Sequence, residues 1–407
     1  MIRADFALRR AGLLVTMVPR DGDPLGRMRD AALASFEGRV VWIGPDSELE
    51  SRVRLDGDLL DAQGCTVLPG LVDAHTHPVF AGSRADEFAQ RLSGVTYAEQ
   101  QSGGRGIMRT VRATRAASDD QLLALARDRA ERFLAHGTTT IEAKTGYGLE
   151  PESESRSLDV LRRLARSTPL RIVATFLGAH VVPDGEDAEA YVRRLTGEML
   201  PAFKGRARYC DAWCDPPAFS AAQTRAILEK ARSLGYQLRL HAAQLAPGEG
   251  PTIAAELGTA SADHLEYATA DQLRALARAG TVAVLCPAAG FTVPGSPRPP
   301  IEAMREAKVA IAIASDLNPG TSNSESLTFA MSLACILWGM TPVEVLLGAT
   351  VHAARSLGLQ GVAGCLSPGS LADLALFDVG AVEEIPYHVG VNRALMTVVG
   401  GRRWSPA

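Results

Sequence analysis

Eight short apolar stretches alternate with helix-like stretches through the middle of the chain, from about Val67 to Leu357. This alternation is typical of βαβ units, which place their strands in one parallel sheet. Eight units in about 290 residues fit a closed (β/α)₈ barrel, and the alternative, a doubly wound open sheet, would be favoured by a G-x-G-x-x-G fingerprint that the chain lacks. The predicted strands are Val67–Ala74, Thr138–Ala143, Arg171–Leu177, Tyr209–Trp213, Gln237–Leu240, Ser261–Asp263, Thr281–Leu285 and Ala310–Ala314, with clear helices at Asp119–Ala135, Glu152–Ala165, Ala221–Leu234 and Asp271–Ala279.

The two ends of the chain have a different texture from the middle. Both contain short β-like stretches among turn-rich segments, and neither has long helical periodicity. These stretches are Leu13–Val18, Arg39–Ile43, Asp373–Phe377 and Ala394–Val399. The predicted fold is therefore α/β: a TIM-like (β/α)₈ barrel of residues 67–357, with a small β-sandwich domain built jointly by residues 1–66 and 358–407.

Polar residues follow most of the predicted barrel strands. In (β/α)₈ enzymes the chemistry lies at the C-terminal ends of the strands. Five of the eight histidines lie at such ends, and Asp316 follows the eighth strand. These histidines are His75, His77, His180, His241 and His264. Chance placement would rarely produce this distribution, which predicts a site at the mouth of the barrel.

His75 and His77 are the sharpest indication of a metal. Residues two apart on a strand point the same way, so both imidazoles can bind one ion on the barrel axis. Imidazole suits Zn²⁺ or iron, and a carboxylate commonly completes such a set. We therefore predict His75, His77, His241 and Asp316 as ligands of one divalent or trivalent ion per chain, with zinc expected and iron the alternative. The set leaves room for a water whose pKa the metal lowers.

Two of these strand-end residues have further predicted roles. Asp316 can accept a proton from that water as well as bind the metal. His264 is predicted to orient the nucleophile or transfer its proton; the alternative is a core histidine bonded to backbone.

The overall charge and the apolar runs exclude several classes of partner. The chain has 42 basic and 46 acidic residues, and its arginines are scattered, so no nucleic-acid surface is expected. The six cysteines form no C-x-x-C pair, which fits a reducing compartment. The apolar run near the N-terminus is too short for a signal peptide, and Phe329–Met340 is too short to span a membrane. We expect a cytoplasmic protein that binds neither membrane nor nucleic acid, and a homodimer as the commonest assembly.

Five stretches of the chain carry a resemblance to a known family. The first resembles the opening strand of the amidohydrolase superfamily, and the others are similar to the imidazolonepropionase family within it. They are PGLVDAHTH at residues 69–77, EAKTGYGL at 142–149, FLGAH at 176–180, SADHLEY at 261–267 and SDLNPGTS at 315–322. The resemblance covers nearly the whole chain, including the split terminal domain.

The resemblance implies metal-dependent hydrolysis of 4-imidazolone-5-propanoate to N-formimidoyl-L-glutamate in histidine degradation. Arg84 can offer a bidentate fork to the propanoate. By the same resemblance, hydroxyl contacts, ring contacts and the far wall of the site are expected from Tyr97, Tyr147, His180, Gln244, Asn318, Gly320 and Thr321. Gln244, like Asp316 and His264, is also expected to lie at the reacting centre.

The chain departs from the family in three places, and two other kinds of function remain as alternatives. Arg105 interrupts a glycine run, residues 286–297 differ from the usual aromatic-rich form, and Gln244 replaces a Glu of some members. One alternative is another mononuclear cyclic-amide hydrolase or a nucleobase-type aminohydrolase. Arg84 favours a carboxylate-bearing small molecule over a neutral base, and the fourth strand has no Lys to carry a second metal. A non-catalytic barrel scaffold is disfavoured because all four predicted ligands are present.

Overall fold

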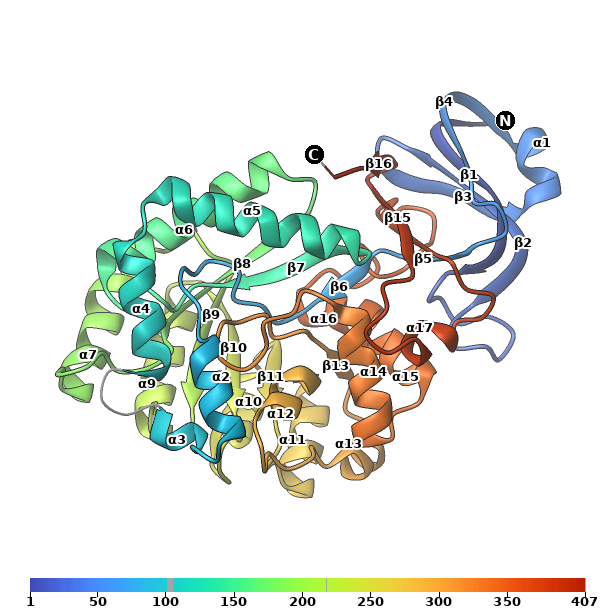
Figure 1. The fold of residues 1–407 in the computed structure, drawn as a ribbon. Helices are drawn as coiled ribbons and strands as arrows, with labels where there is room; N and C mark the ends of the chain where they lie inside the picture. The colour runs from blue at the N-terminus through green and yellow to red at the C-terminus, as the bar shows by residue number, and fades with distance from the viewer. Residues whose placement is uncertain (101–104, 217, 407) are drawn as a thin grey trace.

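The computed structural model describes residues 1–100, 105–216 and 218–406. In it, the predicted parallel strands form one eight-stranded sheet, in the order β13-β12-β11-β10-β9-β8-β7-β6. Helices cover its outside (Figure 1). The strands are β6 (Leu71–Asp73), β7 (Thr138–Lys144), β8 (Arg171–Ala179), β9 (Tyr209–Cys214), β10 (Gln237–Ala242), β11 (Ser261–His264), β12 (Val282–Leu285) and β13 (Ile311–Ile313).

The covering helices begin where the sequence provides caps. Four of them start with a capping box, in which a Ser or Thr and the residue three positions later satisfy each other's free backbone N–H groups. The main outer helices are α5 (Asp119–Ala135), α6 (Pro151–Ser167), α7 (Ala188–Arg194), α9 (Ala221–Ser233), α10 (Gly250–Leu257), α11 (Ala270–Ala279), α13 (Ile301–Ala307), α14 (Leu327–Trp338) and α15 (Pro342–Leu347). Among the described residues, none of the helices combines the length and the apolar character needed to cross a membrane.

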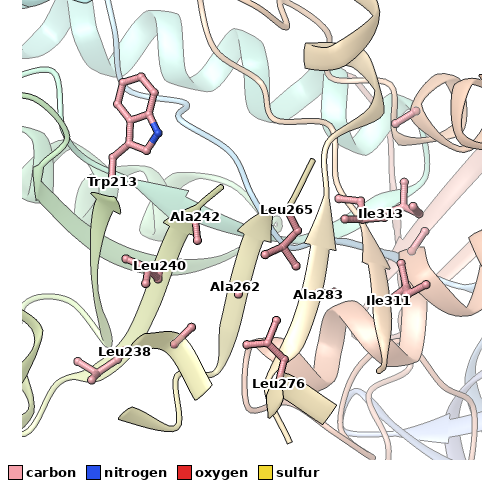
Figure 2. Close-up of a cluster of buried hydrophobic side chains, with 14 of the residues drawn as sticks. Trp213, Leu238, Leu240, Ala242, Ala262, Leu265, Leu276, Ala283, Ile311 and Ile313 are labelled. Carbon is pink, nitrogen blue, oxygen red and sulfur yellow. The ribbon is translucent and has the colours of Figure 1, made fainter. Parts of the chain in front are cut away.

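Side chains alternate between the two faces of each barrel strand. Leu238, Leu240 and Ala242 of β10 join the apolar cluster beneath the helices (Figure 2). The residues between them, Arg239 and His241, are also buried, and they face the barrel interior. The inside of this barrel therefore carries charged and polar side chains, while the apolar core lies between the strands and the helices.

The first predicted strand, Val67–Ala74, is wrong as a single element. It divides at Gly70 into β5 (Thr66–Pro69) and β6, which belong to different sheets. A Cβ at residue 70 would lie 2.2 Å from the Thr139 hydroxyl oxygen, so the chain passes β7 too closely for a side chain. The apolar run of residues 67–72 conceals this change of sheet, because both halves are buried.

Both ends of the chain build the second sheet, as predicted, and the two termini lie near it (Figure 1). It is a mixed sheet that branches at β1, which pairs with β4 along its first half and with β5 near its end. Its strands are β1 (Ile2–Val15), β2 (Arg27–Phe36), β3 (Arg39–Pro45), β4 (Val53–Asp61), β5, β14 (Leu374–Phe377), β15 (Ala394–Val399) and β16 (Arg402–Trp404). The predicted strand Leu13–Val18 overlaps only the end of the much longer β1, and its last three residues lie beyond that strand. The assignment of residues 1–66 with 358–407 and of 67–357 to separate domains stays a prediction.

The barrel closes between its first and last strands through the segments that follow them. The Asp316 amide donates to the His75 carbonyl at 3.0 Å, and the His77 amide donates to the Leu317 carbonyl at 2.8 Å. The carboxylate of Asp73 accepts from the amide of Ser315 at 3.1 Å. The bonds that close the barrel therefore also fix His75, His77 and Asp316 beside one another.

Candidate metal centre and substrate pocket

The four predicted metal ligands converge at the mouth of the barrel. His75 Nε2 lies 3.3 Å from His77 Nε2, and Asp316 Oδ1 lies 3.4 Å and 3.6 Å from these two nitrogens. One ligand atom each from His75, His77 and His241 lies within 4.8 Å of the others. All four side chains are buried. The sequence-based ligand set is thus brought together by the fold.

Two carboxylates orient the imidazoles. Asp263 Oδ2 lies 2.7 Å from His75 Nδ1, and Asp211 Oδ2 lies 3.0 Å from His241 Nδ1. A carboxylate on one ring nitrogen fixes the tautomer that leaves the other nitrogen free to bind a metal. Burial, and then the charge of Lys144, lowers the pKa of His75 well below its usual value. The pKa of His77 is also well below its usual value, first because of burial and then because of His75. Both rings are therefore held in the neutral form that ligates metals.

This donor set fits one metal ion. Two nitrogens bound to tetrahedral zinc at about 2.0–2.1 Å stand about 3.3 Å apart, which matches His75 and His77. Burial raises the pKa of Asp316 well above its ordinary value, although the hydrogen bond from Asn318 and the charge of Lys144 act against it. A metal cation between the three imidazoles and this carboxylate would supply the missing charge.

A layer of buried charges lies beneath the ligands; we call Glu142, Lys144, Asp211, Arg239 and Asp263 the charge layer. Lys144 Nζ lies 2.8 Å from Glu142, 2.6 Å from Asp211 and 3.4 Å from Asp263. Arg239 lies 3.4 Å from Glu142 and 3.6 Å from Asp263. With three carboxylates against two cations, the layer carries one net negative charge beneath a site for a cation.

The charge layer keeps Lys144 and Asp211 ionised despite their complete burial. Desolvation alone would lower the pKa of Lys144, but Asp211, Glu142 and Asp263 outweigh it and raise that pKa. Desolvation would likewise raise the pKa of Asp211, but His241 and Lys144 hold it well below its usual range. Lys144 is therefore a permanent cation shared by the two carboxylates that orient metal ligands.

Sequence reasoning gave the charge layer no role, although a signal was available. Arg239 stands two residues before His241, and Glu142 stands two before Lys144. Side chains two residues apart on a strand point to the same face. Arg239 and Glu142 therefore face the barrel interior, as the residues at the ends of their strands do. Asp73, two residues before His75, follows the same rule.

Strained backbone occurs at two residues of the site. His264 has φ +79° and Asp316 has φ +52°, in the left-handed region that residues with a Cβ rarely adopt. His264 ends β11, and Asp316 lies three residues beyond the end of β13. Such strain persists where the surrounding structure fixes it, and it is concentrated at functional sites.

One pocket above the metal ligands gathers most of the predicted substrate contacts. Its lining is His77, Arg84, Ile107, Tyr147, His180, Trp213, His241, Gln244, His264, Asp316, Asn318 and Thr321. Ile107 and Trp213 were not predicted. Trp213 stands two residues after Asp211 on β9, and so faces the same side of that strand. The pocket thus combines a metal-binding floor with aromatic walls.

Arg84 supplies the pocket with a buried cation. It lies at the start of α2 (Ala85–Leu92), and only 4% of its surface is exposed. Its Nε donates to Glu87 at 2.7 Å, while Nη2 has no hydrogen-bond partner among the described residues. A buried guanidinium N–H without a partner is costly, and an anionic group in the pocket would satisfy it.

His180 and Tyr147 form one wall. His180 Nδ1 lies 3.0 Å from the Gly146 carbonyl, and burial lowers its pKa to about 3, so Nδ1 carries the hydrogen of the neutral ring. Its ring stacks on His77, with 5.3 Å between centroids, and Tyr147 packs against both rings. The buried carboxylate of Glu154, which sequence reasoning missed, accepts from the amides of residues 146, 148 and 149 and so shapes this loop.

The segment after β13 holds the remaining predicted contacts. The Asn318 amide oxygen accepts from the backbone of Gly320 and Thr321, and its Nδ2 donates to the Asp316 carbonyl at 2.7 Å. Asn318 therefore shapes this loop as well as lining the pocket. Gly320 lies outside the pocket lining, beside the guanidinium of Arg84: a Cβ there would meet Arg84 Nη1 at 2.5 Å.

Gln244 and His264 line the opposite side of the pocket. The backbone amide of Gln244 is held by Asp215 at 3.0 Å, which leaves the side chain toward the pocket. His264 packs beside His75 and His241, and its Nδ1 lacks a hydrogen-bond partner within the described part of the chain. Tyr97 begins α3 (Tyr97–Gln100), but its side chain lies outside the described residues, so its predicted contact stays a prediction.

Known proteins are similar to this chain in sequence and in fold. A model of the amidohydrolase family matches residues 66–403, so the chain belongs to that family. Within it, an imidazolonepropionase from Ralstonia nicotianae is 43% identical over 94% of both chains, and one from Symbiobacterium thermophilum is 42% identical over 98% of this chain and 96% of its own. The chain is thus a member of the imidazolonepropionase family.

A solved structure supports the architecture alone. An adenosine deaminase from Xanthomonas campestris with bound zinc has a TM-score of 0.74 and 18% identity, over 99% of this chain and 93% of its own. The likeness confirms the barrel and the sheet built by both termini. The family and the histidine–aspartate cluster together support a bound metal ion.

Proposed function

We propose that this chain hydrolyses 4-imidazolone-5-propanoate to N-formimidoyl-L-glutamate, the activity expected of an imidazolonepropionase. The observation that carries the proposal is one pocket that holds both a three-histidine, one-carboxylate metal centre and a buried arginine with an unsatisfied N–H. The substrate has the matching pair of groups: a ring carbonyl to be attacked and a propanoate to be anchored.

Arg84 anchors the propanoate. Its guanidinium is fixed at Nε by Glu87, so Nη2 is presented without a large loss of side-chain entropy. Tyr147 and His180 contact the imidazolone ring from one wall, and Gln244 and Thr321 contact it from the others. These contacts turn the ring carbonyl toward His75, His77, His241 and Asp316.

These four residues would hold a metal ion, which would supply a lowered pKa for a water molecule and polarisation of the ring carbonyl. Asp316 and His264 take up the proton that the attacking water loses. Water oxygen bonds to the carbonyl carbon, the adjacent C–N bond breaks, and the same proton passes to the departing nitrogen. The water oxygen remains in the new carboxyl group, which releases the water's second proton to solvent and becomes a carboxylate, so atoms and charges balance.

We also propose the finer features of this site and of the protein's setting. Zinc is the proposed ion, with iron the alternative, because three imidazoles and one carboxylate suit either metal. A homodimer in the cytoplasm is proposed from the general frequency of such assemblies and from the cysteine usage. Metal analysis of the purified protein and analytical ultracentrifugation test the metal and the assembly.

Incubating metal-analysed protein with imidazolone propanoate tests the function. We expect the ultraviolet absorbance of the ring to disappear only with metal-loaded protein, and N-formimidoyl-L-glutamate to form in equal amount. Metal-stripped protein is the matched control. Metal-loaded protein that leaves this substrate intact but hydrolyses a cyclic amide without a carboxylate would overturn the assignment.

A further inference from the structure

Cys286 places a thiol beside the metal centre. It follows β12 directly and is fully buried, and its Sγ lies within 4.8 Å of a ring nitrogen of both His75 and His264. The pairing of β11 with β12 sets Asp263 opposite Val284, so His264 and Cys286 leave adjacent strands at nearly the same height. Three potential ligands therefore converge on a second point at the barrel mouth.

His264 is the second observation that indicates a ligand there. Its side chain is 2% exposed, and Nδ1 has no hydrogen-bond partner among the residues described. Cys210, a buried cysteine on β9, offers a contrast, because its Sγ lies 3.8 Å from the Asp211 carbonyl and it belongs to none of the metal-binding groups of the described residues. Cys286 therefore differs from a cysteine that serves only to fill the core.

We propose that His75, His264 and Cys286 form an alternative metal position that selects soft ions such as Cd²⁺. Thiolate prefers soft metals, whereas the three imidazoles and carboxylate of the first position suit zinc or iron. On binding, the Cys286 thiol loses its proton to solvent and the sulfur becomes a ligand.

The two positions exclude each other. His75 Nδ1 is engaged by Asp263 at 2.7 Å, so only Nε2 is available to a metal, and it can bind one ion at a time. A soft ion at the alternative position thus displaces the first ion, and it also occupies His264. The inhibition that follows rests on the proposed function, in which His264 carries a proton.

The test titrates metal-stripped protein with Cd²⁺ and records the thiolate-to-cadmium charge-transfer absorbance. We expect the band to saturate at one ion per chain in the wild type and in Cys210→Ala, the matched control. In Cys286→Ala the band should disappear and cadmium affinity should fall about tenfold or more. Cys286→Ser provides a variant of equal volume should the Ala variant fail to fold.

A band of full size in folded Cys286→Ala or Cys286→Ser, or its absence from the wild type, would overturn the proposal. Turnover gives a separate result: Cd²⁺ should inhibit the zinc-loaded wild type, and Cys286→Ala should relieve that inhibition while keeping zinc-dependent activity. Equal inhibition of both proteins would refute the inhibitory role. Zinc-loaded protein without any hydrolase activity would refute the proposed function instead, because the absorbance test does not depend on turnover.

Discussion

The charge layer and the pocket above it differ in how many carboxylates surround their buried cations: Arg84 of the pocket meets one, Glu87. In the charge layer, Lys144 lies within 3.4 Å of three carboxylates, and Arg239 joins two of them. In the pocket, Arg84 Nη2 and His264 Nδ1 have no hydrogen-bond partner within the described residues. The difference indicates a division of labour: the lower groups are paired with one another to hold the ligands, and the upper groups are left to bind substrate and move protons.

Removing the carboxylate of the metal centre should have the largest effect. Asp316→Ala deletes a metal ligand and a proton acceptor at once, so we expect turnover to fall by about a thousandfold or more. Steady-state kinetics with metal analysis of the same sample measure this effect. A variant that keeps both its metal and its activity would refute both roles of Asp316.

Removing the shared cation of the charge layer should destabilise the whole barrel. Lys144→Met removes the cation that Glu142, Asp211 and Asp263 share, and breaking a buried charge pair costs about 3–5 kcal/mol. The free energy of unfolding in urea measures the loss. Lys204→Met, at an exposed lysine, is the control and should change stability by less than about 0.5 kcal/mol. Equal stability of Lys144→Met and wild type would show that the layer is not a structural unit.

Removing the pocket's cation should leave the fold intact and weaken substrate binding. Arg84→Ala loses a charge-assisted contact to the propanoate, so we expect KM to rise about tenfold to a hundredfold. For a cyclic substrate without the carboxylate, the same substitution should raise KM much less. Comparable losses for both substrates would mean that Arg84 is not the anchor.

The smallest change tests how Arg84 is positioned. In Gly320→Ala the new Cβ would lie 2.5 Å from Arg84 Nη1, while Glu87 holds Nε, so the guanidinium must tilt. We expect KM to rise a few-fold with unchanged metal content. Gly248→Ala is the matched control, because a Cβ at residue 248 meets nothing within 4 Å. An unaltered KM in Gly320→Ala would show that the contact leaves the anchor unaffected.

The sequence predicted the ligands better than the groups that support them. His75 and His77 stand out in the sequence because they follow an apolar strand and lie two residues apart. Both features are local. The charge layer depends on four different strands, so Asp211 and Arg239 looked like isolated polar residues in apolar strands. Only the closed barrel brings them together.

The same limit explains the first strand. Val67–Ala74 is continuously apolar, and nothing local indicates that β5 pairs with β14, which lies some 300 residues later. Pairing between distant strands is a property of the whole fold. The C-terminal ends of the strands, in contrast, were predicted well, since polar residues mark them in the sequence.

Metal affinity of two variants, measured side by side, tests the division of labour most directly. Each purified protein, Lys144→Met and Arg84→Ala, is titrated with Zn²⁺ against a competing chelator. We expect zinc affinity to fall about tenfold to a hundredfold in Lys144→Met, because the carboxylates that orient His75 and His241 lose their cation, and to stay at the wild-type value in Arg84→Ala. Wild-type affinity in Lys144→Met, or an equal loss in both variants, would contradict this account.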